Sequence, residues 1–374
     1  MFSERDAYIA LNLIRDLGPV TVRLLTEVLG SASALFEADA RQLLAVKGTG
    51  TEIVKKLIAA RRKVDAAAEI ERAASLGAEI LTPADSGYPD PLRQIYDPPL
   101  ALYVKGTLEA RDRHAVAIVG SRHTTSYGRE CASAFSAQLS RAGFTIVSGL
   151  ARGIDTSAHQ GALKAGGRTL AVLGGGLHDI YPPENRELAE EIAASGAVIS
   201  EFQLGREPDK TTFPIRNRIV SGLSQGVIVV EAGLSSGAMI TANVAAEQGR
   251  SVFAIPGRID SPTSQGTHQL IKNGARLVDS AAEVVDDLGS LFTACTRSPI
   301  RHAGEAVRPS RIQVPLSDVE QTVMQRLSEE DRLDVDTLIR QCGLPAATIS
   351  ATLLMLEMKR VVRSLPGRFV EVVH

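Results

Sequence analysis

The sequence predicts an α/β protein built on a Rossmann-like, doubly wound and mostly parallel sheet, with a helical domain before it and a winged-helix domain after it. Between residues 115 and 290, short continuous apolar runs alternate with helical segments, as expected for parallel strands that helices cover on both faces. Apolar residues recur at helical spacing through roughly the first 75 residues. Three helical segments and a strand pair end the chain.

The composition is typical of a multidomain soluble protein. The 374 residues are 44% hydrophobic and 22% charged, which excludes wholesale disorder. Lys and Arg number 41 against 43 Asp and Glu, so the formal net charge is -2. This balance excludes a globally basic nucleic-acid binder, but it leaves a local basic patch open.

The cysteines and the N-terminus indicate the cellular compartment. Cys131, Cys295 and Cys342 are scattered, which predicts no disulfide framework and fits a reducing cytoplasm. The charged N-terminal segment lacks the apolar core of a signal peptide, and no apolar run approaches membrane-spanning length. We therefore expect a cytoplasmic protein that does not contact a membrane.

The helical domain is predicted over residues 1–75. Gly18-Pro19 breaks its first helix, and Gly30-Ser31 ends the second. The turn Lys47–Gly50 places two glycines between later helices, as in SAM-like or helix-hairpin-helix-like domains. Such a turn can hold a DNA phosphate on its backbone N–H groups. An ordinary turn in a helical bundle also fits, and we favour it.

The central domain is predicted over residues 76–292. Its connector, residues 78–106, is Pro-rich, and its prolines are expected to forbid a helix before a strand at Leu100–Val104. The strands that follow are predicted at Val116–Val119, Thr145–Val147, Thr169–Leu173, Val198–Ser200, Val227–Val230, Val252–Ile255 and Arg276–Val278. The helices between them are predicted at Gly128–Arg141, Thr156–Ala165, Asn185–Ala194, Arg216–Leu223, Ala238–Gln248 and Thr267–Lys272.

A linker and a small domain complete the chain. Residues 293–313 lack apolar periodicity and are rich in arginine, which predicts a flexible linker. Residues 314–374 read as a winged helix, with helices at Asp318–Leu327, Val335–Gln341 and Pro345–Lys359 and a hairpin turned at Pro366-Gly367. The third helix has few base-reading side chains apart from Lys359 and Arg360. A structural or interaction module therefore fits at least as well as a sequence-specific DNA reader.

The loops after the predicted strands carry glycines, hydroxyls and basic residues. In an open parallel sheet these loops meet at one edge, where ligands bind and helix N-termini attract anions. The sequence lacks a G-x-G-x-x-G after the first strand, a P-loop and a G-x-S-x-G elbow, which disfavours dinucleotide, triphosphate and esterase chemistry. No His, Cys and carboxylate cluster has metal-ligand spacing. We therefore predict a phosphate-binding edge with no cofactor, no metal and no catalytic residue.

The most informative segment is Asp209–Arg218, where cations flank an aromatic side chain. Lys and Arg neutralise phosphates, and an aromatic ring stacks an unpaired base. Together with the turn after the first strand, this segment predicts a single-stranded DNA site. Its predicted DNA-binding residues are Gly120, Ser121, Arg122, Lys210, Phe213, Arg216, Asn217 and Arg218. In the alternative, Phe213 packs under its own loop and the two arginines pair with Glu201 or Glu207.

Three other groups of side chains have both a chemical and a structural interpretation. Asp155 and His159 lie one helical turn apart, and we favour a helix cap with a local hydrogen bond over an acid–base dyad. Glu231, with the serines after it, is compatible with a hydrolytic site. It is equally compatible with a carboxylate that accepts hydrogen bonds from the backbone of its Gly-rich turn. His178 and Tyr181 suggest a metal or sugar site, but we favour a structural role in their loop.

Several long motifs resemble the DNA-processing protein A (DprA/Smf) family, densely over residues 88–290. They are AIVGSRHTTSYG, VSGLARGIDTSAHQGAL, TLAVLGGGLHDIYPPENREL, KTTFPIRNRIVSGLSQGVIVVEA, SSGAMITANVAAEQGRSVFAIPG and SQGTHQLIKNGA. The resemblance implies a cytoplasmic homodimer, formed through the Rossmann-like domain, that binds single-stranded DNA without sequence preference. It also implies protection of incoming DNA and loading of the RecA recombinase during natural transformation. The family's DNA pocket falls on Arg122, Lys210 and Phe213, with Arg216 and Arg218 adjacent.

A second class of protein shares this fold superfamily. The lysine-decarboxylase-like phosphoribohydrolases use a Gly-Gly-x-Gly-Thr motif with a catalytic Glu, and only a degraded counterpart stands at Glu231–Gly237. This departure argues against hydrolysis but not against a bound nucleotide. We therefore expect a protein that is not an enzyme, and we keep a nucleotide-binding or nucleotide-hydrolysing enzyme as the alternative.

Overall fold

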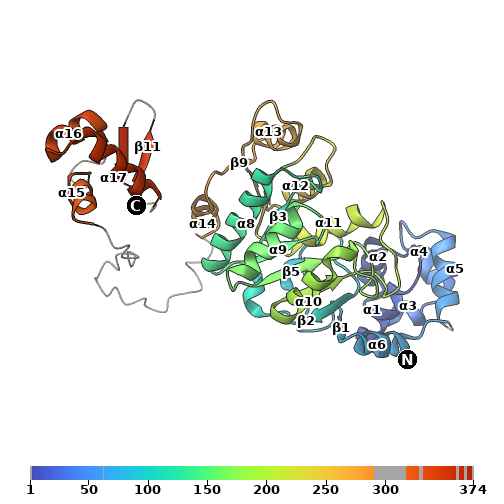
Figure 1. The fold of residues 1–374 in the computed structure, drawn as a ribbon. Helices are drawn as coiled ribbons and strands as arrows, with labels where there is room; N and C mark the ends of the chain where they lie inside the picture. The colour runs from blue at the N-terminus through green and yellow to red at the C-terminus, as the bar shows by residue number, and fades with distance from the viewer. Residues whose placement is uncertain are drawn as a thin grey trace. The chain divides into compact units, whose positions relative to one another are not determined.

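The computed structural model describes residues 2–61, 63–289, 317–327, 332–358, 362–365 and 369–372 (Figure 1). The chain divides into two compact units, Met1–Arg297 and Ser298–His374. The predicted linker at 293–313 and the predicted turn at Pro366-Gly367 lie outside the described residues. Within those residues, no helix has both the length and the apolar character that a membrane crossing requires.

The larger unit begins with helices, as predicted. Gly18 precedes the second helix and Pro19 opens it, while Gly30 ends it with a left-handed φ of 94°, so both predicted breaks are confirmed. Gly48 also adopts a left-handed φ, of 93°, in the turn between two later helices. The bounds are α1 (Glu4–Asn12), α2 (Pro19–Leu29), α3 (Ala34–Glu37), α4 (Ala40–Ala45), α5 (Thr51–Ala60) and α6 (Ala66–Ser75).

A nine-stranded, mostly parallel sheet forms the centre of this unit, in the order β1-β2-β6-β5-β4-β3-β7-β8-β9. Strands β1 and β2 run antiparallel to their neighbours, and the remaining pairs are parallel. The bounds are β1 (Ala78–Leu81), β2 (Leu102–Gly106), β3 (Ala115–Val119), β4 (Thr145–Ser148), β5 (Thr169–Val172), β6 (Ala197–Ser200), β7 (Gly226–Val229), β8 (Ser251–Ala254) and β9 (Arg276–Leu277). The predicted doubly wound sheet is confirmed.

The connector departs from its prediction in two ways. It contributes the extra strand β1, which pairs with β2. It also contains the short helix α7 (Asp90–Arg93), so the expectation that its prolines forbid any helix is wrong. Pro91 lies in the first turn of α7, where the missing N–H has no intrahelical partner to lose.

Helices cover both faces of the sheet (Figure 1). One face packs against α8 (Ser126–Arg141), α9 (Ile154–Lys164), α10 (Arg186–Ser195) and α14 (Ala281–Gly289). The other packs against α7, α11 (Thr212–Gly222), α12 (Gly237–Glu247) and α13 (Gln265–Lys272). Short 3-10 turns are η1 (Ala110–Arg113), η2 (Pro183–Asn185) and η3 (Pro262–Ser264). Helix α11 begins four residues before its predicted start at Arg216, so Phe213 belongs to a helix rather than to a loop.

The winding of the sheet reverses beside β3. From β3 the chain adds β4, β5 and β6 on one side, and it then returns through α11 to place β7 on the other side of β3. Ligands of doubly wound sheets bind at this kind of reversal, beyond the carboxyl ends of the strands. The topology therefore directs attention to the loops that follow β3 and β7.

The C-terminal unit has the predicted winged-helix content. It contains α15 (Asp318–Leu327), β10 (Arg332–Asp334), α16 (Val335–Cys342), α17 (Ala346–Met358), β11 (Val362–Leu365) and β12 (Phe369–Val372), with the strands in the order β10-β12-β11. Asp334 caps α16, and its carboxylate accepts a hydrogen bond from the Thr337 N–H at 2.9 Å. Val323, Leu338 and Leu356 belong to its buried core. Lys359 and Arg360, the predicted basic end of α17, lie outside the described residues.

Candidate nucleic-acid interface

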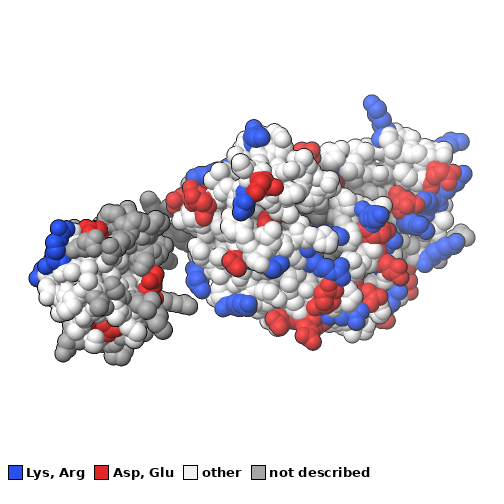
Figure 2. Space-filling view, turned by 45° about the horizontal axis from the view of Figure 1, so that its top comes forward, with Lys and Arg blue, Asp and Glu red and all other residues white. Residues whose placement is uncertain are grey.

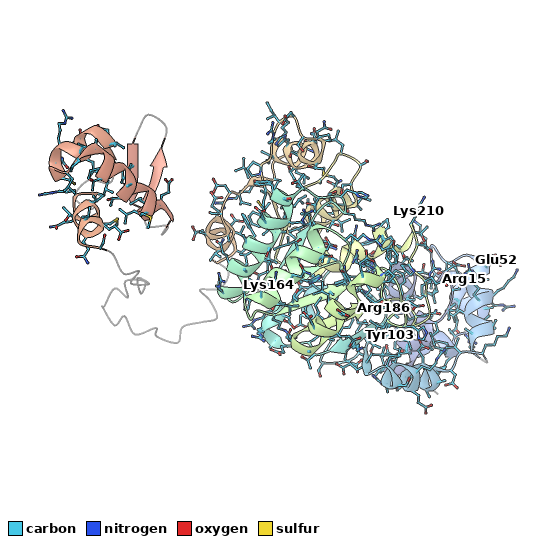
Figure 3. All side chains as sticks on the ribbon, viewed as in Figure 1. Arg15, Glu52, Tyr103, Lys164, Arg186 and Lys210 are labelled. Carbon is cyan, nitrogen blue, oxygen red and sulfur yellow. The ribbon has the colours of Figure 1, made fainter. Side chains whose placement is uncertain are left out.

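A cleft of about 560 Å³ opens at the carboxyl ends of the strands, between the loops after β3, β4 and β7 and the first turns of α11. It is lined by all but one of the predicted DNA-binding residues, namely Gly120, Ser121, Arg122, Lys210, Phe213, Arg216 and Asn217. Figure 3 labels Lys210 on the loop that leads into α11. We call this space the rim cleft.

Arg122 and Phe213 form the contact that defines the rim cleft. The Arg122 guanidinium carbon lies 4.5 Å from the centroid of the Phe213 ring, a cation–π arrangement. Phe213 is half-buried, and Gly174 lies beneath its ring. A Cβ at Gly174 would come within 2.6 Å of Phe213 Cδ1, so the glycine lets the ring settle against the end of β5.

Two residues outside the predicted DNA site extend this contact. The Tyr181 ring lies 6.1 Å from the Phe213 ring, and the Arg152 guanidinium lies 5.7 Å from the Tyr181 ring. Arg152 also pairs with Glu184. Arg122, Phe213, Tyr181 and Arg152 therefore form a row in which two neighbouring aromatic rings lie between two cations. Tyr181 is an exposed aromatic residue in a polar loop. An aromatic residue in such a loop is the sequence feature that could have identified it as part of the site.

Arg216 lies beneath the rim cleft rather than at its mouth. It is 4% exposed, and its Nη1 donates to the carbonyl oxygen of Gly149 at 2.7 Å and to that of Val172. Burial lowers the pKa of Arg216 to about 10, and the Asp155 carboxylate partly opposes this shift. The guanidinium remains charged at neutral pH, so it places a positive charge under the ends of β4 and β5.

Arg218 is the predicted DNA-binding residue that does not line the rim cleft. It is 6% exposed and pairs with Glu201 and, at 3.1 Å, with Asp97. Residues two apart in a helix point about 200° away from each other, so Arg216 and Arg218 diverge. Both cations fall within the helix predicted at Arg216–Leu223, but the predicted site grouped them on one surface because they are close in sequence. The alternative pairing of Arg218 with Glu201 is confirmed.

The possible Asp155–His159 dyad has structural partners instead. Asp155 Oδ2 accepts hydrogen bonds from the backbone N–H groups of Gly149 and Ala151, and burial raises its pKa although Arg216 opposes the shift. His159 is fully buried, and its Nδ1 bonds Thr169 Oγ1 at 2.7 Å. Burial lowers the pKa of His159 to about 3. A histidine in this state is a core group rather than a proton carrier for a ligand.

Glu231 is also fully engaged. Its carboxylate accepts hydrogen bonds from the Thr124 hydroxyl, at 2.5 Å, and from the Thr125 N–H and hydroxyl, at 2.9 and 2.6 Å. These partners stand at the start of α8, so Glu231 stabilises that helix N-terminus and not the Gly-rich turn after β7. Across the described parts of the chain, no cluster of three or more His, Cys, Asp or Glu residues is arranged to hold a metal ion.

Two family models match the chain. Residues 79–289 match DNA recombination-mediator protein A, and residues 307–368 match the DprA winged helix domain. A Rossmann-like domain with a cationic, aromatic cleft and a winged helix is thus the architecture of a DNA-processing protein. The chain belongs to the DNA recombination-mediator protein A family, and the resemblance found in its motifs is confirmed.

Individual relatives match most of the chain. It is 35% identical to Protein Smf of Synechocystis over 98% of both chains. It is 40% identical to Protein Smf of Escherichia coli over 78% of this chain and 76% of the relative. The structure of DNA processing protein A from Streptococcus pneumoniae superposes with a TM-score of 0.67 at 34% identity, covering 76% of this chain and 98% of that one. A structure of the Helicobacter pylori protein, described in terms of its single-stranded DNA binding mode, gives a TM-score of 0.51 at 32% identity over 56% and 96% of the chains.

Proposed function

We propose that the rim cleft binds single-stranded DNA without sequence preference. The observation that carries this proposal is the Arg122 guanidinium held over the Phe213 ring inside the cleft. The part of the Phe213 ring that remains exposed stacks an unpaired base, while Arg122 and Lys210 neutralise neighbouring phosphates. The relative from Helicobacter pylori, whose structure concerns single-stranded DNA binding, supports the same assignment.

The wider proposal follows the family. The protein acts in the cytoplasm as a homodimer joined through its Rossmann-like domains, protects incoming single strands and loads RecA onto them during natural transformation. Figure 2 supports a local site rather than a broad basic surface, because Lys and Arg are interspersed with Asp and Glu over the face it shows. Arg216 and Asn217 act from beneath, by shaping the cleft, and Arg218 has no proposed DNA contact.

A matched set of variants tests the cleft. Each phosphate contact with a single strand contributes about 0.7 to the slope of log affinity against log salt. Arg122→Ala and Lys210→Ala should each weaken binding of all single strands alike and lower this slope by about 0.7. Lys164→Ala is the control, because α9 begins beside the cleft at Ile154 and ends at Lys164, on the opposite edge of the sheet (Figure 3). Unchanged affinity in both cleft variants would remove the proposed site.

The alternative, a nucleotide-hydrolysing enzyme, has less support. A phosphoribohydrolase needs a free catalytic carboxylate, whereas the Glu231 carboxylate accepts several hydrogen bonds at the start of α8. The proposal therefore assigns no catalytic residue. Incubation of the purified protein with nucleoside monophosphates, followed by chromatography, should release no free base, and release that Glu231→Gln abolishes would establish the alternative.

A further inference from the structure

A second groove, of about 990 Å³, lies next to the rim cleft. It runs between α2 of the helical region, the connector after α7, and helices α11 and α12. Pro214, in the first turn of α11, lines both spaces. A chain that leaves the rim cleft over Pro214 therefore enters the second groove directly, and we call this groove the α2–α12 groove.

The α2–α12 groove offers an aromatic ring to a ligand. Tyr96 is 67% exposed, so much of its ring surface is accessible to a ligand. Arg23 of α2 covers one face of it, with the guanidinium carbon 4.3 Å from the ring centroid and Nη1 donating to the Tyr96 carbonyl oxygen at 2.6 Å. Ile95 and Ile215 supply apolar wall beside it. This arrangement repeats the cation and ring pair of the rim cleft.

Some buried polar atoms in the lining of the groove have no hydrogen-bond partner among the described residues. Arg218 Nη1, Gln248 Oε1 and Arg250 Nε are buried there without a hydrogen-bond partner. The Arg218 side chain is only 8% exposed, and buried polar groups normally have partners. Gln248 Nε2 donates to the Arg218 carbonyl oxygen, so Oε1 is the amide atom that has no partner.

The charge of the groove is mixed, which limits what can bind. Arg23, Arg218 and Arg250 face Asp97 and Glu247, and Asp97 already pairs with Arg218. The Glu247 carboxylate repels each phosphate that enters the groove, so a run of phosphates is disfavoured more strongly than a base with a single phosphate. The chemistry therefore suits a nucleobase more than a run of phosphates.

We infer that the α2–α12 groove is a second base-binding subsite for the strand held in the rim cleft. This inference rests on the proposed function. A base from a flanking nucleotide stacks on the open face of Tyr96, opposite Arg23, with its edge toward Gln248. The helical region thereby becomes part of the DNA-binding surface, through Arg23.

Binding to dT oligomers of increasing length, from about 4 to about 16 nucleotides, tests the inference on the full-length protein. Tyr96→Ala should bind the shortest oligomers like the wild type and the longer ones about tenfold more weakly, because only longer strands reach the groove. Tyr96→Phe keeps the ring and should match the wild type at every length. Glu247→Gln, which removes an opposing charge, should strengthen binding of the longer oligomers alone.

The location of the base is tested by photo-crosslinking. Oligomers that carry one 5-iododeoxyuridine at a defined position should crosslink to Tyr96 only when that position lies outside the nucleotides that crosslink to Phe213. Equal binding by Tyr96→Ala and the wild type at all lengths, or an absence of crosslinks to Tyr96, would overturn the subsite. Failure of the proposed function would give a different result, because the wild type would then bind no oligomer of any length.

Discussion

The Phe213 ring should supply a large part of the affinity for a single strand. Replacing it with alanine removes the stacking surface, which is worth about 1–3 kcal/mol for one base. It also removes the cation–π contact that positions Arg122 at 4.5 Å, worth about 0.5–1 kcal/mol at an accessible site. Together these losses amount to about 1.5–4 kcal/mol, or about 10- to 700-fold in Kd.

The salt dependence distinguishes stacking from charge. Phe213→Ala removes no charge, so the slope of log affinity against log salt should stay near its wild-type value while the affinity falls at every salt concentration. Fluorescence anisotropy with a labelled dT oligomer over a series of KCl concentrations measures both quantities, and Phe213→Tyr, which keeps the ring, is the matched control. Wild-type affinity in Phe213→Ala, or a slope lowered by about 0.7, would refute the stacking role.

Two further predictions concern the buried groups beneath the rim cleft. Arg216→Met should lower the free energy of unfolding by about 3 kcal/mol, because the carbonyl groups of Gly149 and Val172 lose a charged donor; denaturant unfolding within 0.5 kcal/mol of the wild type would contradict this. His159 has a folded-state pKa of about 3, well below the ordinary histidine value of 6.5, so between those two pH values the unfolded chain binds a proton that the folded chain does not. The stability that neutral His159 contributes is complete above pH 6.5 and should fall by about 1.4 kcal/mol per pH unit below it. The free energy of unfolding of His159→Gln should lack this dependence on pH. Parallel pH profiles for the two proteins would contradict the prediction.

The central sheet could be predicted closely because its strands are continuous apolar runs. Strands buried on both faces carry their signal in local composition, and the observed strands begin and end within a residue or two of the predicted ones, as at Ala115–Val119. Strand β1 was missed because its burial alternates and its partner β2 is distant in sequence. The residues of a strand do not by themselves indicate which distant segment it pairs with.

The site was predicted less completely, and for a specific reason. Pro214 made the segment before Arg216 look like a loop, yet proline is tolerated in the first turn of a helix, and α11 begins at Thr212. The helix predicted from Arg216 already separates Arg216 from Arg218 by its period, and the predicted site did not apply that period. The contact of Tyr181 with Phe213 joins a loop residue to a residue of α11 that is distant in sequence, so no spacing rule within one segment identifies it.

The way in which the helical region is anchored bears on how the protein can be divided. Ile9 and Leu11 of α1 share one continuous core with Ile80 of β1 and Tyr103 of β2, and Tyr103 donates its hydroxyl to Glu69 of α6 at 2.9 Å. Cutting the chain after residue 75 would expose this apolar surface and leave the Tyr103 hydroxyl without its acceptor. A truncated protein that aggregates or loses activity would therefore report a damaged sheet edge, and intact chains with single exposed substitutions are the sounder way to assign a role to the first helices.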